Sequence, residues 1–143
     1  MPAANPFQER LQRIQPAIHG RCLVCGAEAP QGLHVAFEAL SDGSVRGAVG
    51  RRPDLEGYPE RLHGGVIASI LDGAMTNCLF AHGVTAVTGA LTVRYRRPVS
   101  TCEPVEVRAW LERSAHGVHR MGSELRQGGG VVVTATATFV PGP

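Results

Sequence analysis

A short polar stripe interrupts an otherwise apolar segment of the sequence, and its residue types suit hydrolytic chemistry. Ser69, Asp72, Gly73 and Thr76 follow the spacing i, i+3, i+4 and i+7, so in a helix they share one face. Their neighbours are almost all apolar, which predicts a buried helix over residues 65–81. Burial of a carboxylate is costly unless it is paired or used, and it raises the pKa toward that of a general base or nucleophile. The stripe alone leaves open a structural alternative, in which Asp72 pairs with an arginine or caps a loop.

The residues just before this helix favour a binding role for its first turn. They are His63, Gly64 and Gly65, and no Ser, Thr, Asp or Asn stands there as an N-cap. We therefore expect the first backbone amides to be free, with the helix dipole favouring a negative group beside them. Paired glycines also allow a ligand to approach the backbone. An oxyanion hole for acyl transfer needs these properties. A plain glycine turn would contain the same residues, but an aspartate eight positions after Gly64 makes the acyl-transfer interpretation more specific.

The remaining pattern predicts which elements hold these residues in place. A short amphipathic helix is expected over residues 5–18, ended by Pro16 and Gly20. A hairpin turn is expected at 41–43 and a loop over 50–62. One buried helix among many strands predicts an α+β fold, in which a curved antiparallel sheet of about six strands wraps a long central helix. The last four strands are expected to form a meander. The predicted strands are 33–40, 44–49, 85–97, 105–112, 118–126 and 131–140.

Length and composition place the chain among ordinary globular domains. It has 143 residues, 43% hydrophobic and 18% charged, and we interpret residues 1–143 as one domain. Within it, residues 1–32 form an N-terminal helix and a cysteine-containing loop, and residues 33–140 form the core. A net charge of +2 gives no support for a nucleic-acid partner. We see no run of about 18 apolar residues that would suit a membrane. Glu9 and Arg10 lie where an export signal would be apolar, so we expect a cytoplasmic protein without a membrane partner.

A second cluster of reactive residues lies near the N-terminus. Cys22 and Cys25 have the C-x-x-C spacing, with His19 three residues before them. This spacing suits a structural zinc site, for which His34 or a partner chain would supply a fourth ligand. It also suits a redox dithiol, although no thioredoxin-like βαβ pattern surrounds it. The sequence favours a third interpretation, two reduced cysteines in a tight glycine turn. We therefore expect no metal in the mechanism and no cofactor.

Three segments of the sequence together resemble one family. They read RLHGGVIASILDGAM from residue 61, TGALTVRYRRPV from residue 88 and TATATFV from residue 134. These segments resemble the hotdog-fold thioesterases of the phenylacetate-degradation type, over residues 33–140. The upstream CLVCGAEAPQGLHVAF is similar to one branch of that superfamily. The resemblance implies a long helix wrapped by an antiparallel sheet, assembly as homodimers and often homotetramers (dimers of dimers), and hydrolysis of acyl-CoA without a metal.

The resemblance also implies roles for individual residues. Gly64 matches the glycine whose amide polarises the thioester carbonyl, and Asp72 matches the carboxylate that activates water or attacks directly. Thr88 falls where many members have a Ser or Thr that orients the water, and Thr76 matches a supporting hydroxyl of a related branch. His63 either fills part of the oxyanion site or packs the helix start. The candidate substrate-binding residues are Gly65, Ser69 and Arg97. The guanidinium of Arg97 suits a coenzyme A phosphate.

The sequence departs from this family at one position of the expected site. Many members have an Asn or Gln six or seven residues before the His-Gly pair, as a second contact to the carbonyl. Here that stretch is Glu56, Gly57 and Tyr58. Two other function classes therefore stay open. One is a non-catalytic module that binds thioesters, and the other is a hotdog dehydratase, which usually has a His–Asp or His–Glu pair on the helix. The spacing of Gly64 and Asp72 favours hydrolysis.

Overall fold

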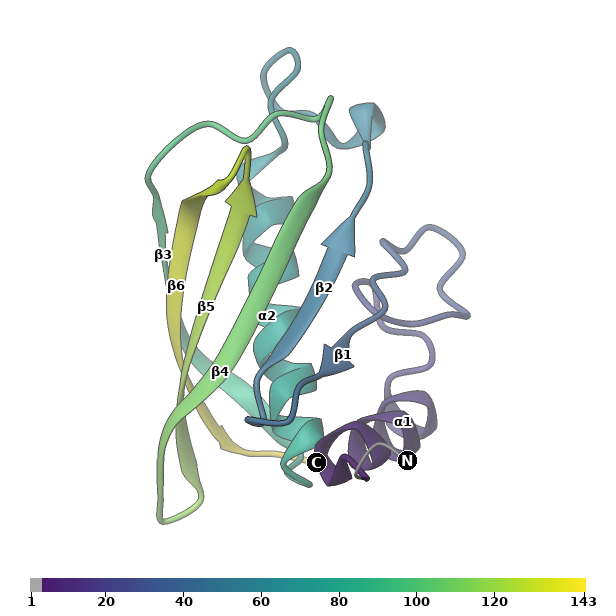
Figure 1. Ribbon diagram of the computed structural model, residues 1–143, viewed down its shortest axis with the longest axis vertical. Coiled ribbons are helices and arrows are strands. Elements are labelled where there is room, and N and C mark those ends of the chain that lie inside the picture. The colour runs from purple at the N-terminus through teal and green to yellow at the C-terminus, as the bar shows by residue number, and fades with distance from the viewer. Residues whose placement is uncertain (1–3) are drawn as a thin grey trace.

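A six-stranded sheet and one central helix form most of the protein (Figure 1). The structure is a computed structural model, and it describes residues 4–143. The α+β class, the antiparallel sheet and the long helix are as predicted from the sequence. In chain order the elements are α1 (Pro6–Ile18), β1 (Glu38–Ala39), β2 (Val45–Val49), the 3₁₀ turn η1 (Pro53–Leu55), α2 (Gly64–Ala81), β3 (Ala86–Tyr95), β4 (Val105–Ala115), β5 (Val118–Gln127) and β6 (Gly130–Pro141).

The sheet has the strand order β1-β2-β4-β5-β6-β3, and all neighbours are antiparallel. Strands β4, β5 and β6 form the predicted meander, but β3 does not join it in sequence order. It pairs with β6 instead, from Ala86 opposite Pro141 to Tyr95 opposite Val133. The segment 96–104 is long enough to cross from one flank of the sheet to the other, whereas a meander needs a tight turn. The prediction of four sequential meander strands was therefore wrong for β3.

The N-terminal third differs from the prediction at two places. Helix α1 continues through Pro16 to Ile18, so Pro16 does not end it. The predicted strand 33–40 is reduced to Glu38–Ala39. Its first half turns away from the sheet, because the amide of Leu33 donates to the carbonyl of Leu23 and that of Val35 to Val24. The cysteine-containing loop therefore takes the backbone hydrogen bonds that a strand partner would have taken.

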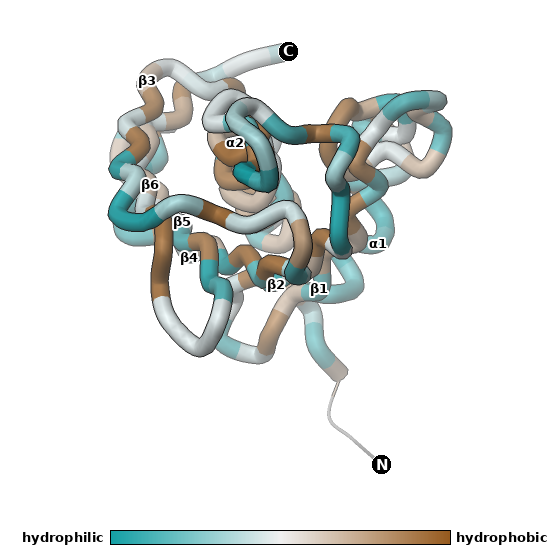
Figure 2. Tube along the Cα trace, turned by 90° about the horizontal axis from the view of Figure 1, so that it is seen from above, coloured by the Kyte–Doolittle hydropathy of each residue, from teal (hydrophilic) through white to brown (hydrophobic). Residues whose placement is uncertain are grey.

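Helix α2 lies at the centre of the hydrophobic core. Ile70, Leu71 and Ala74 have no exposed surface, and Met75 and Met121 are also fully buried packing residues. Figure 2 shows this apolar helix with the strands on one side and α1 on the other. By length and composition alone, α2 is also apolar enough to cross a membrane, contrary to our expectation. However, 61% of this 18-residue stretch is buried inside the protein, as is usual for a core helix.

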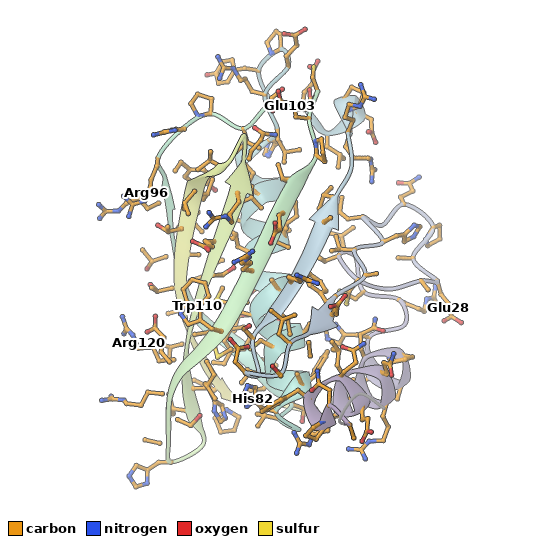
Figure 3. All side chains as sticks on the ribbon, viewed as in Figure 1. Glu28, His82, Arg96, Glu103, Trp110 and Arg120 are labelled. Atoms are coloured by element: carbon orange, nitrogen blue, oxygen red, sulfur yellow. The ribbon has the colours of Figure 1, made fainter. Side chains whose placement is uncertain are left out.

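The two faces of α2 are covered differently. The sheet wraps one side of α2. On the inner face of the sheet, Val107, Leu125 and Phe139 are fully buried. The other side is covered by α1 and the loop that follows, and the guanidinium of Arg10 donates to the carbonyl of Ala81 at 3.1 Å. Trp110, labelled in Figure 3, packs against Gly122 of the neighbouring strand.

Strand β3 is an edge strand with unusual exposure. Almost every residue of its ten is exposed, including Val87, Leu91 and Tyr95. Within residues 4–143, its other edge has no strand partner. A long, exposed edge with apolar side chains is a template for pairing with another chain.

Candidate active site

Asp72 lies in the middle of α2, half-buried, at the flank where β3 passes the helix. The hydroxyl of Thr88 donates to Asp72 Oδ1 at 2.6 Å. Burial raises the pKa of Asp72 above its ordinary value, and the Thr88 hydrogen bond opposes part of this shift. No arginine or lysine forms an ion pair with Asp72 within residues 4–143. The structural alternative, an ion pair on the stripe, is therefore not what the structure shows.

A bulge in β3 turns Thr88 toward the helix. The register with β6 shifts between Thr88, opposite Phe139, and Ala90, opposite Thr138. Phe139 is fully buried on the helix side of the sheet, so its partner Thr88 faces α2 as well. The extra residue of the bulge is Gly89. The position has little room for a side chain, because a Cβ there would lie 3.1 Å from Val140 Cγ1 and 3.2 Å from the Thr138 carbonyl oxygen.

The start of α2 differs from the expectation that all its first amides are free. The side chain of His63 is the N-cap, and its Nδ1 accepts a hydrogen bond from the Gly65 amide at 2.9 Å. This occupies the amide of Gly65 and places the proton of the neutral imidazole on Nε2. The Gly64 amide has no hydrogen-bond acceptor within residues 4–143. Gly64 is therefore the available donor at this helix end, and the expectation was wrong for Gly65.

Two shallow clefts adjoin Gly64. One of about 340 Å³ is lined by residues that include Gly64, Tyr95 and Arg97. The other, of about 280 Å³, is lined by His63, Gly64 and Arg61 among others. The structure thus brings Arg97 to the same cleft as the free amide, and Arg61 lines both clefts. The side chain of Arg96 reaches outward at this edge of the sheet (Figure 3).

Tyr95 belongs to the candidate site, and the sequence analysis missed it. Its hydroxyl donates to the Gly64 carbonyl oxygen at 2.6 Å, and so fixes the first residue of α2 against the end of β3. Its position before two arginines and a proline looked like a strand end only. Its role becomes visible only when the end of β3 is known to lie beside the start of α2. That placement depends on the segment that crosses from β3 to β4.

The polar stripe is only partly open. Ser69 donates to the Gly65 carbonyl at 2.9 Å, and Thr76 donates to the Asp72 backbone carbonyl at 3.0 Å. Both hydroxyls therefore bond to their own helix, and neither touches the Asp72 carboxylate. Gly73 faces the N-terminal loop, since a Cβ there would lie 2.6 Å from Val24 Cγ1. Within the stripe, Asp72 therefore lies at the partly exposed flank of α2, whereas Gly73 is buried against Val24.

The cysteine cluster is close enough to act on Asp72. The charges of Cys22 and His19 both affect the pKa of Asp72, the first raising it and the second lowering it. A hydrogen bond from the Cys25 thiol lowers the pKa of Cys22 to about 4, and the same bond raises the pKa of Cys25 well above its usual range. His34, which we considered as a fourth ligand, contacts the Ala29 carbonyl with Nε2 at 2.6 Å and is not part of the cluster.

Comparison with known proteins identifies the family. The sequence model of the thioesterase superfamily matches residues 60–134, which include α2, β3 and the residues around Asp72. The chain belongs to the thioesterase superfamily. Among curated thioesterases, the acyl-coenzyme A thioesterase THEM4 of Bos taurus is 34% identical over 61 residues, or 43% of this chain. The chain spans about a quarter of the length of the curated relatives it matches, 24% in this case.

Several solved structures share the fold. A thioesterase superfamily protein is 32% identical with a TM-score of 0.80, covering 84% of this chain and 60% of the other. A phenylacetic acid degradation-related protein from Ralstonia eutropha is 25% identical with a TM-score of 0.70, covering 93% and 98% of the two chains. The PaaI protein of the E. coli phenylacetic acid degradation operon has a TM-score of 0.80 at 14% identity, covering 96% of each chain. The predicted hotdog fold is therefore confirmed.

Proposed function

We propose that this thioesterase superfamily member hydrolyses acyl thioesters of coenzyme A to the free acid and thiol. The observation that supports this most is the half-buried Asp72 carboxylate, which accepts a hydrogen bond from Thr88 and has a raised pKa. A carboxylate of this kind suits a general base or nucleophile. The acyl-coenzyme A thioesterases among its relatives point to the same substrate class.

The proposed roles follow the geometry. The free amide of Gly64 donates to the thioester oxygen as negative charge develops there. Thr88 orients the Asp72 carboxylate and the attacking water. His63 caps the helix and presents Nε2–H near the same cleft, where it substitutes in part for the missing Asn or Gln. Arg97 binds a phosphate of coenzyme A at the cleft edge.

Three further residues from the sequence analysis have smaller proposed roles. Gly65 permits close approach of the thioester, although its own amide is already bonded to His63. Ser69 and Thr76 hold the helix turns on either side of Asp72 through their backbone hydrogen bonds. No metal takes part in this mechanism.

We further propose that two copies of the chain share each active site. Gly64 and Asp72 are eight residues apart, about 12 Å along a helix at 1.5 Å per residue. A carbonyl held by the Gly64 amide is then beyond the roughly 3 Å reach of Asp72 on the same helix. The exposed edge and apolar side chains of β3 support an isologous dimer, in which the partner supplies the second residue. A dimer of such dimers and a cytoplasmic location are also our predictions.

Steady-state assays on a small acyl-CoA panel test the proposed function. Hydrolysis releases free thiol in proportion to free acid. A dehydratase would interconvert 3-hydroxyacyl and enoyl thioesters without releasing thiol, and a binding module would bind acyl-CoA with no turnover. Thiol release supports the proposal, and either other outcome contradicts it. No histidine lies in α2, where the dehydratases usually have one, which favours hydrolysis.

The exchange Thr88→Val should shift the pH dependence of the reaction. The Thr88 hydroxyl lowers the pKa of Asp72, so its removal raises that pKa further. Because the base must be ionised, the acidic limb of the kcat/KM profile should move to higher pH. The maximal rate should fall about tenfold, as expected for losing one hydrogen bond to a charged group. Thr92→Val is the matched control, on the same strand but not bonded to Asp72, and an equal shift there would contradict the assignment.

Replacing both Cys22 and Cys25 by serine should leave kcat per folded molecule unchanged. Neither sulfur is part of the proposed reaction, although both lie in the loop whose Val24 packs against Gly73 of α2. The variant should melt at a lower temperature, because the cysteine-containing loop packs on α2 through Val24. Measuring kcat after correction for the folded fraction checks this. If the variant folded and assembled normally but lost its turnover, thiol chemistry or a metal would have to enter the mechanism.

A further inference from the structure

Three metal-binding side chains meet in the N-terminal segment, outside the proposed reaction. His19 is the C-cap of α1, and Cys22 and Cys25 follow in the loop. One ligand atom from each lies within 4.8 Å of the other two. Neither cysteine forms a disulfide. The end of α1 and the loop after it therefore bring together a group of atoms that no step of the proposed hydrolysis uses.

The distances suit a tetrahedral metal. Zinc binds thiolate sulfur at about 2.3 Å and imidazole nitrogen at about 2.0–2.1 Å, so neighbouring ligand atoms are about 3.6 Å apart. Cys25 Sγ and His19 Nδ1 are 3.7 Å apart. A metal ion can therefore bind both atoms with almost no movement of the backbone. Two thiolates and one imidazole are a soft donor set, which favours zinc over magnesium or calcium.

The loop is built so that both sulfurs point to the same place. The Gly26 amide donates to the Cys22 carbonyl at 2.9 Å, and the Val24 amide donates to Cys22 Sγ at 3.4 Å. Gly26 is needed for this turn, because a Cβ there would lie 2.4 Å from the Cys22 nitrogen. The backbone thus stabilises negative charge on the sulfur of Cys22.

An unpartnered buried oxygen lies next to the cluster. Asn77 of α2 is 1% exposed, and its Oδ1 has no hydrogen-bond partner within residues 4–143, while its Nδ2 donates to the Gly73 carbonyl at 2.8 Å. Asn77 and Cys25 line one cavity of about 320 Å³, which has room for water. A buried acceptor without a donor needs an explanation, such as a water or an ion. A metal-bound water would donate the missing hydrogen bond to Asn77.

We propose that His19, Cys22 and Cys25 bind one zinc ion per chain, with a water held by Asn77 in the fourth position. The metal joins the end of α1 to the loop that contains Val24. Val24 in turn packs against Gly73, next to Asp72 on α2. The zinc therefore fixes the loop that packs on α2 next to Asp72, and it does not take part in the reaction.

Elemental analysis and native mass spectrometry of the freshly purified protein test this proposal. One zinc per chain is expected in the wild-type protein and in Cys102→Ser, which removes an exposed thiol elsewhere. Cys22→Ser, Cys25→Ser and His19→Gln should each lose it, whereas His34→Gln should keep it. Chelation should lower the melting temperature of the wild-type protein by about 5–10 °C and leave that of Cys22→Ser unchanged.

Cobalt titration of the reduced, metal-free wild-type protein makes the test independent of how the variants fold. Tetrahedral coordination with two thiolates predicts sulfur-to-cobalt charge-transfer absorption that saturates at one cobalt per chain, and zinc should displace it. Absence of this absorption would overturn the proposal. So would zinc content that survives in Cys22→Ser, or a Cys22–Cys25 disulfide in a protein that takes up no metal after reduction.

Discussion

Asp72→Asn should lower the rate of thioester hydrolysis about 10²–10⁴-fold, the usual effect of losing a general base or nucleophile. The exchange is nearly isosteric, and the asparagine side chain keeps an Oδ1 that accepts the Thr88 hydroxyl. The fold should therefore persist while the base is lost. Free-thiol release from acyl-CoA measures the rate, and full activity in a folded variant would show that Asp72 is not the base.

The same variant should be at least as stable as the wild-type protein at neutral pH. Burial raises the pKa of Asp72 in the folded state above its unfolded value. Such a group contributes stability that is fully present below the unfolded pKa and is lost as the pH rises through the folded pKa. The asparagine amide does not titrate, so the melting temperature of the variant relative to the wild-type protein should improve as the pH rises from acid to neutral.

Asp42→Asn is the matched control for both effects. Asp42 is exposed in the hairpin turn, and hydrogen bonds from Ser44 lower its pKa. Activity should be unchanged. The pH trend in stability should be reversed, because a lowered pKa contributes stability that is lost as the pH falls. If both variants lost activity equally, the effect at Asp72 would not be specific to the site.

Mixing two inactive variants should restore about a quarter of the wild-type activity if the site is shared between subunits. The pair is Asp72→Asn and Gly64→Pro, which removes the amide that donates to the thioester. With random exchange at equal concentrations, half of the dimers are hybrid, and each hybrid has one intact site of two. If exchange is confirmed independently and no activity returns, both residues act within one chain.

The structure supports the choice of proline for this test. Gly64 is the first residue of α2, where proline is tolerated. His63 before it has φ −59° and ψ 133°, the backbone region that a residue preceding proline prefers. Gly64→Ala is the control that keeps the amide, and its Cβ would meet nothing closer than Tyr95 Oη at 3.6 Å. It should retain most of the activity, whereas the proline variant should not.

The central helix and the position of Asp72 on it could be predicted from local sequence, because an apolar run with one polar stripe has few structural solutions. The cap at the helix start could not be predicted in this way. Histidine is not among the usual N-cap residues, so the bond from the Gly65 amide to His63 was missed. Thr88 was named only through the family resemblance. Its contact with Asp72 depends on the β3 bulge at Gly89, and no periodic pattern shows such a shift.

The contacts that depend on how the chain crosses the sheet also could not be predicted from local sequence. Tyr95 reaches Gly64 only because β3 leaves the meander and pairs with β6. Val24 reaches Gly73 only because the segment after α1 folds back over α2 in place of a full first strand. Both contacts join segments far apart in the chain, so no local sequence pattern shows them.

The most direct test of the central claim is turnover by the wild-type protein in water labelled with heavy oxygen. The purified chain is incubated with acyl-CoA, and the free thiol and free acid are measured together. Thioester hydrolysis predicts one thiol for each acid, many turnovers per chain, and one solvent oxygen in the carboxylate of the released acid. Intact acyl-CoA after prolonged incubation with the folded protein, across the whole acyl panel, would contradict the account.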